Sequence, residues 1–209
     1  MIIVHKCAGL ATQSADVSRK DCVSILKEHI KKNTPGLKSE PYLGIIHRLD
    51  RPVEGLLVFA KDKRTAADLS RQVQNGKMKK GYTALVEGIV DAPTDTGLKD
   101  MMCKDGKRNM AVIYDDGRAG LQEARLSYRT ERILKEENRS ILSIRLITGR
   151  FHQIRAQLSH MGHPIVGDTK YGALSSYPEG IALVANRLEF IHPLTGEKIE
   201  KAVDFSFLL

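Results

Sequence analysis

The sequence predicts an α+β fold. Three segments, 19–31, 62–74 and 151–161, carry apolar residues at helical spacing among a larger number of short segments with strand character. In the middle of the chain the strand-like segments follow one another with short connections, which favours antiparallel pairing. A chain of 209 residues can bury a substantial core and fits one large domain or two small ones.

The N-terminal part is expected to hold a strand, a helix and a loop. Residues 2–4 are typical of a short buried strand, and 33–41 of a loop. Between them, Ser18 followed by Asp21 is a helix-start signature, a hydroxyl cap with an acid three residues later. The apolar stripe of 19–31 is expected to face the core.

A second strand and helix follow. Residues 56–60 form an almost unbroken apolar run of strand length, and the helix 62–74 is expected to stop at Asn75-Gly76. The loop before the apolar strand 82–86 is basic, which indicates either ordinary solvated charges or a track for phosphates. Its lysines are Lys77, Lys79 and Lys80.

The remainder of the chain is expected to be mainly β. Residues 91–109 are polar and turn-rich and predict no regular element. Strands are expected near 110–114, 122–130, 141–147, 181–185, 188–191 and 198–205, with 192–196 as the turn of the last hairpin.

The stretch 45–61 places a polar loop directly before a buried strand. Within it, Asp50 lies between Arg48 and Arg51, whose charges favour the ionised form of a carboxylate. An ionised aspartate held in a cleft is a candidate nucleophile or base. The alternative is an aspartate that starts a turn and pairs with a neighbouring arginine on the surface.

A second polar stretch, 148–172, places Arg150 and Arg155 at the beginning of the helix 151–161. The helix dipole does not favour cations there, so these arginines need either a carboxylate or phosphate partner or an exit to water. Three histidines lie in the same stretch without an HExxH arrangement or a neighbouring acidic cluster, so no metal site is expected. They are His152, His160 and His163.

The overall composition indicates a polyanionic partner. Lys and Arg exceed Asp and Glu by 33 to 25, a formal net charge of +8, which suggests a nucleic acid or an ordinary basic protein. Three scattered cysteines without a CxxC pair are typical of reduced thiols in the cytoplasm. No apolar run approaches the roughly 20 residues of a membrane span, and the N-terminus does not have the form of a secretory signal.

Several blocks together resemble the RluA-type pseudouridine synthases and follow the order of that family. They are HKCAGL at 5–10, HRLDR at 47–51 with GLLVFAK at 55–61, GYTALVEG at 81–88, TGRFHQIRAQL at 148–158 with GHPIVGDTKYG at 162–172, and FIHPLTGE at 190–197. The resemblance spans nearly the whole chain.

The resemblance implies a central mixed, mostly antiparallel sheet flanked by helices, with a catalytic cleft, as one catalytic domain over 1–209. It also implies that Asp50 is the catalytic nucleophile, that Tyr82 packs against the target base, and that Arg155 pairs with Asp50. The neighbouring residues expected to contact RNA are His47, Arg48, Arg51, Lys77, Lys79, Lys80, Arg150, His152 and Gln153.

The chain departs from the family pattern at three places. Cys7 stands where proline is usual, Val53-Glu54 replaces small or hydroxyl residues, and 183–185 reads Leu-Val-Ala where many members have Leu-His-Ala. Glu54 is expected to bring a negative charge close to the RNA path. The chain begins at the first catalytic block, so no S4-like RNA-binding domain is expected.

The expected activity is isomerisation of specific uridines to pseudouridine in structured RNA, rRNA or tRNA, by a cytoplasmic monomer. The reaction needs no redox step and no group donor, so neither cofactor nor metal is expected. Asp50 acts either as a nucleophile or as the base that removes a sugar proton. The competing interpretations are a non-catalytic RNA-binding or chaperone protein and a metal-dependent nuclease, which would need an acidic cluster.

Overall fold

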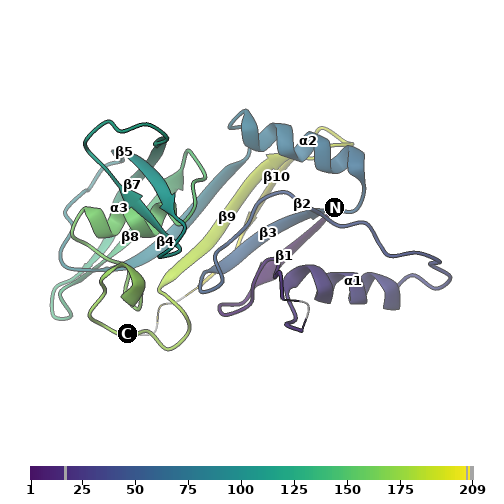
Figure 1. The fold of residues 1–209 in the computed structure, drawn as a ribbon, viewed down its shortest axis with the longest axis horizontal. Coiled ribbons are helices and arrows are strands. Elements are labelled where there is room, and N and C mark those ends of the chain that lie inside the picture. The colour runs from purple at the N-terminus through teal and green to yellow at the C-terminus, as the bar shows by residue number, and fades with distance from the viewer. Residues whose placement is uncertain (17, 206, 208–209) are drawn as a thin grey trace.

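The computed structural model describes residues 1–16, 18–205 and 207. Within these residues ten strands form one sheet, whose main path runs β1-β3-β9-β4-β8-β7-β5-β6, with β2 on β3 and β10 on β9 (Figure 1). The strands are β1 (Ile2–Lys6), β2 (Gly44–Ile45), β3 (Glu54–Ala60), β4 (Lys79–Glu87), β5 (Thr96–Asp105), β6 (Met110–Ile113), β7 (Gln122–Leu134), β8 (Arg139–Leu146), β9 (Leu183–Ile191) and β10 (Lys198–Ala202).

The sheet is mixed and mostly antiparallel, which confirms the predicted fold class. Strands β3 and β9 pair in parallel. The other paired strands in the described part of the chain are antiparallel. The parallel pair lies in the middle of the molecule and joins segments that are more than a hundred residues apart, which no local pattern could predict.

The three expected helices are confirmed with changed ends. They are α1 (Cys22–Lys32), α2 (Lys63–Gln74) and α3 (Gln153–His160), and a 3-10 helix η1 covers Thr169–Tyr171. Helix α1 begins later than predicted because Asp21, not Ser18, caps it: Asp21 Oδ1 accepts from Ser24 N at 2.7 Å. The Ser18 hydroxyl donates to Asp16 instead.

Two predictions about strands were wrong. Residues 91–109 contain β5, whose polar sequence reflects its largely exposed faces; it pairs with both β6 and β7. The two strands expected at 181–185 and 188–191 are one strand, β9.

The basic cluster was placed wrongly in part, since only Lys77 lies on the loop before the strand. Lys79 and Lys80 lie in β4 and not on a loop, because β9 pairs with both residues and β8 pairs with Lys80.

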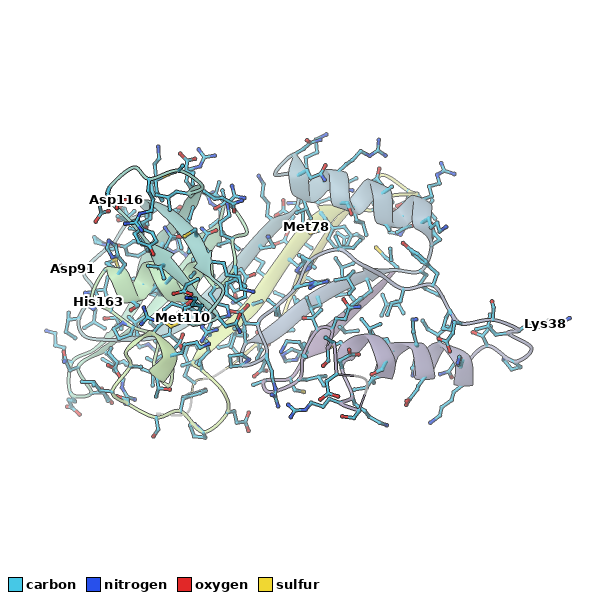
Figure 2. The ribbon with its side chains drawn as sticks, in the orientation of Figure 1. Lys38, Met78, Asp91, Met110, Asp116 and His163 are labelled. Atoms are coloured by element: carbon cyan, nitrogen blue, oxygen red, sulfur yellow. The ribbon has the colours of Figure 1, made fainter. Side chains whose placement is uncertain are left out.

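The strand after the Asp50 loop is buried on both faces, which explains its unbroken apolar sequence. Leu57 and Phe59 pack in one core cluster, while Leu56 and Val58 face a second cluster beneath α2. Met78, labelled in Figure 2 near α2, belongs to that second cluster. Strand β3 therefore gives the Asp50 loop a rigid support.

The helices divide between the two halves of the molecule. In Figure 1, α1 and α2 lie with β1, β2 and β3, and α3 lies with β5, β7 and β8. The Asp50 loop belongs to the first half and α3 to the second. No helix in the described part of the chain combines the length and apolar character needed to cross a bilayer.

Candidate active site

The loop that carries Asp50 is held by the N-terminal segment. The Thr12 hydroxyl donates to Leu49 O at 3.0 Å and accepts from Leu49 N at 3.2 Å. On the other side of Asp50, Gly9 N donates to Arg51 O at 2.9 Å, and Arg51 Nε donates back to Gly9 O at 2.8 Å. These bonds fix the backbone on both sides of the carboxylate.

Lys6 lies beneath the same loop with its ammonium group inside the protein. The residue is 1% exposed, and Nζ donates to the carbonyl oxygens of Cys7 (3.0 Å), Leu10 (2.8 Å) and Arg51 (3.2 Å). Burial lowers the pKa of Lys6 to about 8, while nearby charges, including Asp50, oppose this change. Lys6 therefore ties the first strand to the Asp50 loop.

A close backbone approach joins the Asp50 loop to the centre of the sheet. Gly55 has a φ of +133° and lies opposite Ala185 in the parallel β3–β9 pair. A Cβ atom at residue 55 would lie 2.4 Å from Ala185 O, so only glycine fits at this position.

Arg155, in the first turn of α3, bridges two carboxylates. Its Nη1 donates to Asp50 Oδ2 at 3.2 Å, while Nε and Nη2 donate to the two oxygens of Asp168 at 2.7 and 2.8 Å. Arg155 is 5% exposed and Asp168 is 1% exposed. The anion required near the helix start is thus supplied mainly by Asp168, with Asp50 as the second partner.

Sequence reasoning missed Asp168, although the argument from the helix dipole required an anion. Asp168 lies in the block 162–172, where a carboxylate follows the buried residues Ile165 and Val166. This pattern could have suggested Asp168 as a candidate, but its contact with Arg155 depends on the turn into η1. Tyr171 of the same turn was also missed; its ring lies 4.9 Å from the Arg155 guanidinium carbon.

His152 faces Asp50 from a left-handed backbone conformation. Its φ is +50°, and its Nε2 lies 3.6 Å from Asp50 Oδ2. Its Nδ1 is 2.9 Å from the Tyr171 hydroxyl, and its ring stacks on Phe151 at 3.8 Å. Burial, followed by the charge of Arg155, lowers the pKa of His152 to about 3, so the imidazole is neutral. A positive φ at a residue other than glycine is strained, and such strain is typical of functional sites.

The electrostatic setting of Asp50 differs from the predicted one. Arg48 donates to Gln13 Oε1 at 3.0 Å and Arg51 to Gly9 O, so neither side chain is bonded to Asp50. Burial raises the pKa of Asp50, and the charges of Arg155 and Lys6 oppose that rise. The positive field at the carboxylate therefore comes from distant segments of the chain and not from its sequence neighbours.

Asp50 borders a cleft of about 1070 Å³ that also includes Tyr82 and Arg155. Tyr82 projects from β4 and is 6% exposed, and burial raises the pKa of its hydroxyl. The charge of Asp50 adds to that rise in the pKa. The structure thus brings the three residues expected to be catalytic to one cleft from the β2–β3 loop, β4 and α3.

Most of the residues expected to contact RNA also border this cleft: His47, Arg48, Lys79, Lys80, Arg150, His152 and Gln153. Arg51 and Lys77 are not among the described residues that border the cleft. The Gln153 amide is occupied within the protein, since its oxygen accepts from Thr148 and Arg150 and its nitrogen donates to Arg125 O and Gln157.

His47 is half-buried at the cleft wall, and its imidazole is neutral. Its Nε2 accepts from Val58 N at 3.4 Å, and its Nδ1 has no hydrogen-bond partner among the described residues. Burial, followed by the charge of Lys80, lowers the pKa of His47 to about 3. The imidazole therefore borders the cleft without a positive charge.

The structure shows the environment of Glu54 and Cys7, two of the residues that depart from the family pattern. Glu54 is not among the described residues that border the cleft. Its carboxylate pairs with His5 Nε2 at 2.8 Å and so links β3 to β1. Cys7 is an exposed free thiol next to Lys6. No group of three or more His, Cys, Asp or Glu side chains among the described residues could hold a metal ion.

Comparison with known proteins shows the family. The model of the RNA pseudouridylate synthase family matches residues 1–160, so the chain belongs to that family, and the predicted membership is confirmed. The chain is 30% identical over 213 residues to the uncharacterized RNA pseudouridine synthase YhcT of Bacillus subtilis, covering 98% of this chain and 66% of that protein. It is 34% identical over 212 residues to the ribosomal large subunit pseudouridine synthase D of Nitrosomonas europaea, covering 94% and 57%.

Solved structures agree on the fold. The human RNA pseudouridylate synthase domain containing 1 superimposes with a TM-score of 0.76 at 23% identity, covering 99% of this chain and 80% of that one. Human RNA pseudouridylate synthase domain containing 4 gives a TM-score of 0.75 at 21% identity, covering 98% and 85%. The chain spans less than two thirds of the length of the two curated relatives named above.

Proposed function

We propose that this chain isomerises specific uridines to pseudouridine in structured RNA, in rRNA or tRNA, and that Asp50 starts the reaction. The observation that carries the proposal is the carboxylate of Asp50 on the wall of a large cleft, 3.2 Å from the guanidinium of Arg155. Membership of the pseudouridylate synthase family supports the reaction type.

The reaction breaks the bond between uracil N1 and the ribose and forms a bond from uracil C5 to the same sugar carbon. A proton leaves C5 and N1 gains one, so no electron is lost and no group is donated. Asp50 either attacks the sugar carbon as a nucleophile or removes a sugar proton as a base. Both routes need an ionised carboxylate, which Arg155 and Lys6 favour against the effect of burial.

The target uridine must leave its stack to reach Asp50, which costs a few kcal/mol. Tyr82 at the cleft wall offers a ring against which the extruded base packs, and such stacking recovers about 1–3 kcal/mol. The net charge of +8 and the basic side chains at the cleft support binding of the RNA backbone. Besides Arg155, the lysines and arginines that border the cleft are Arg48, Lys79, Lys80, Arg145 and Arg150.

The continuous sheet supports a single catalytic domain over residues 1–209. The free thiols of Cys7, Cys22 and Cys103 support action in the cytoplasm, where thiols stay reduced.

The decisive experiment uses rRNA and tRNA labelled with tritium at uridine C5 and isolated from cells that lack the gene. The protein is expected to release tritium to water without cutting the strands, and Asp50→Asn is expected to bind the same RNA without release. Binding without release by the unaltered protein would indicate a non-catalytic RNA-binding protein, and strand cleavage would indicate a nuclease. Full activity of Asp50→Asn would contradict the proposed role of this carboxylate.

A further inference from the structure

Arg155 is shared unequally between its two carboxylates. Asp168 accepts from Nε and Nη2 at 2.7 and 2.8 Å, whereas Asp50 accepts only from Nη1, at 3.2 Å. Two parallel short bonds from one guanidinium to one carboxylate form a stronger and more directional contact than a single longer bond. The cation is therefore held primarily by Asp168 and only secondarily by Asp50.

The backbone around Asp168 is rigid. Its N donates to Ile165 O at 2.9 Å, and its O accepts from Tyr171 N at 2.9 Å and Ala173 N at 3.1 Å. The Ser159 hydroxyl of α3 donates to Tyr171 O at 2.6 Å and ties this turn to the helix that carries Arg155. The orientation of the guanidinium is thus set from outside the cleft.

Both contacts to Asp50 fall on one of its oxygens. Arg155 Nη1 and His152 Nε2 lie 3.2 and 3.6 Å from Oδ2. No described residue donates a hydrogen bond to Oδ1, which leaves that atom available to a substrate.

We propose that Asp168 is a positioning residue: it keeps two nitrogens of Arg155 away from Asp50 and so prevents the guanidinium from chelating the reacting carboxylate. A chelated Asp50 would be a poorer nucleophile and a weaker base, since both oxygens would carry charge-assisted bonds. The consequence for catalysis rests on the proposed function. The claim that Arg155 divides its nitrogens between Asp168 and Asp50 does not depend on the proposed function.

Several titratable or charged groups lie close to Asp50 or interact with its charge. They are Arg155 and His152 near the start of α3, Lys6 at the end of β1, Tyr82 on β4 and Tyr171 on η1. Burial is the largest influence and raises the pKa of Asp50, and Arg155 is the largest influence that lowers it. Since Asp168 limits the contact of Arg155 with Asp50, removing the charge of Asp168 strengthens that contact.

The test is a pH titration of the Asp50 carboxyl carbon by NMR in protein carrying 13C-labelled aspartate, with Asp50→Asn to assign the signal. Asp168→Asn is expected to move the Asp50 midpoint to lower pH by roughly one unit, the scale on which one neighbouring charge acts. Ser159→Ala, which loosens the same turn but changes no charge, is the matched control and should leave the midpoint in place. An unchanged midpoint in folded Asp168→Asn overturns the proposal.

If Asp168→Asn does not fold, the same titration in Arg155→Lys tests the proposal. One ammonium cannot chelate Asp168 and reach Asp50 as well, so the Asp50 midpoint should rise as the cation stays with Asp168. A midpoint that falls or stays constant in Arg155→Lys contradicts the proposed division.

An activity measurement separates the two proposals. The acid limb of kcat/KM on tritium-labelled RNA should follow the Asp50 midpoint from one variant to the next. No tritium release by the unaltered protein would remove the proposed function and leave the NMR result to decide the role of Asp168.

Discussion

Lys6 should make the stability of the protein depend on pH in alkaline solution. Lys6 is 1% exposed, and burial lowers the pKa of its ammonium from 10.5 to about 8. In the unfolded chain the amine keeps its ordinary pKa, so between about pH 8 and 10.5 the unfolded state binds more protons than the folded state. The free energy of unfolding should therefore rise with pH across this window.

The size of the rise follows from the pKa change. A difference of about 2.5 between folded and unfolded pKa values corresponds to about 3 kcal/mol when fully developed. In Lys6→Met this contribution is absent, so the stability difference between the original protein and the variant should grow by about 3 kcal/mol from pH 8 to 10.5.

The measurement is urea unfolding followed by circular dichroism, since the chain has no tryptophan. Lys201→Met, which removes an exposed lysine from β10, is the matched control and should show a constant difference from the original protein across the window. The reasoning is refuted if the Lys6→Met difference is equally constant. Such a result would mean that Lys6 binds its proton with the same affinity in the folded and unfolded chains.

Three further predictions concern the cleft. RNA affinity should fall steeply with salt, and Lys80→Ala at the cleft should weaken binding at low salt more than Lys77→Ala outside it; equal filter-binding curves would contradict this. Tyr82→Ala should lose about 1–3 kcal/mol of RNA binding and Tyr82→Phe much less, and equal affinity of the two variants would exclude stacking. In a double-mutant cycle measured by urea unfolding, Asp50→Asn combined with Arg155→Ala should be less destabilising than the sum of the single changes; strict additivity would show that the two side chains do not interact.

The structure explains why local sequence reasoning succeeded for the helices and the buried strand. Helix spacing and capping are short-range patterns, so α2 begins after Asp62 and stops at Asn75 as its residues indicate. The polar strand β5 was missed because its largely exposed faces impose no alternation, and its pairing with β7 is a long-range contact. Ser18 was misjudged as a cap because Asp21 competes for the same role three residues later.

The sequence by itself determined the three helices, most strands of the α+β fold, the basic charge and the candidate residues Asp50 and Arg155. These follow from residue type and short spacing, whereas Tyr82 and the expected roles of all three residues came from the resemblance of whole blocks to the family. Only the tertiary structure decided which charges meet. Arg48 and Arg51, adjacent in sequence to Asp50, bond elsewhere.

The charges that reach Asp50 come from distant segments. Lys6 arrives through the pairing of β1 with β3, and Arg155 through α3. Asp168 accepts two of the three hydrogen bonds that Arg155 donates to carboxylates. The turn into η1 brings Asp168 next to Arg155. The physical reason is that electrostatic energy depends on distance through space and on burial, and neither quantity is contained in the order of residues along the chain.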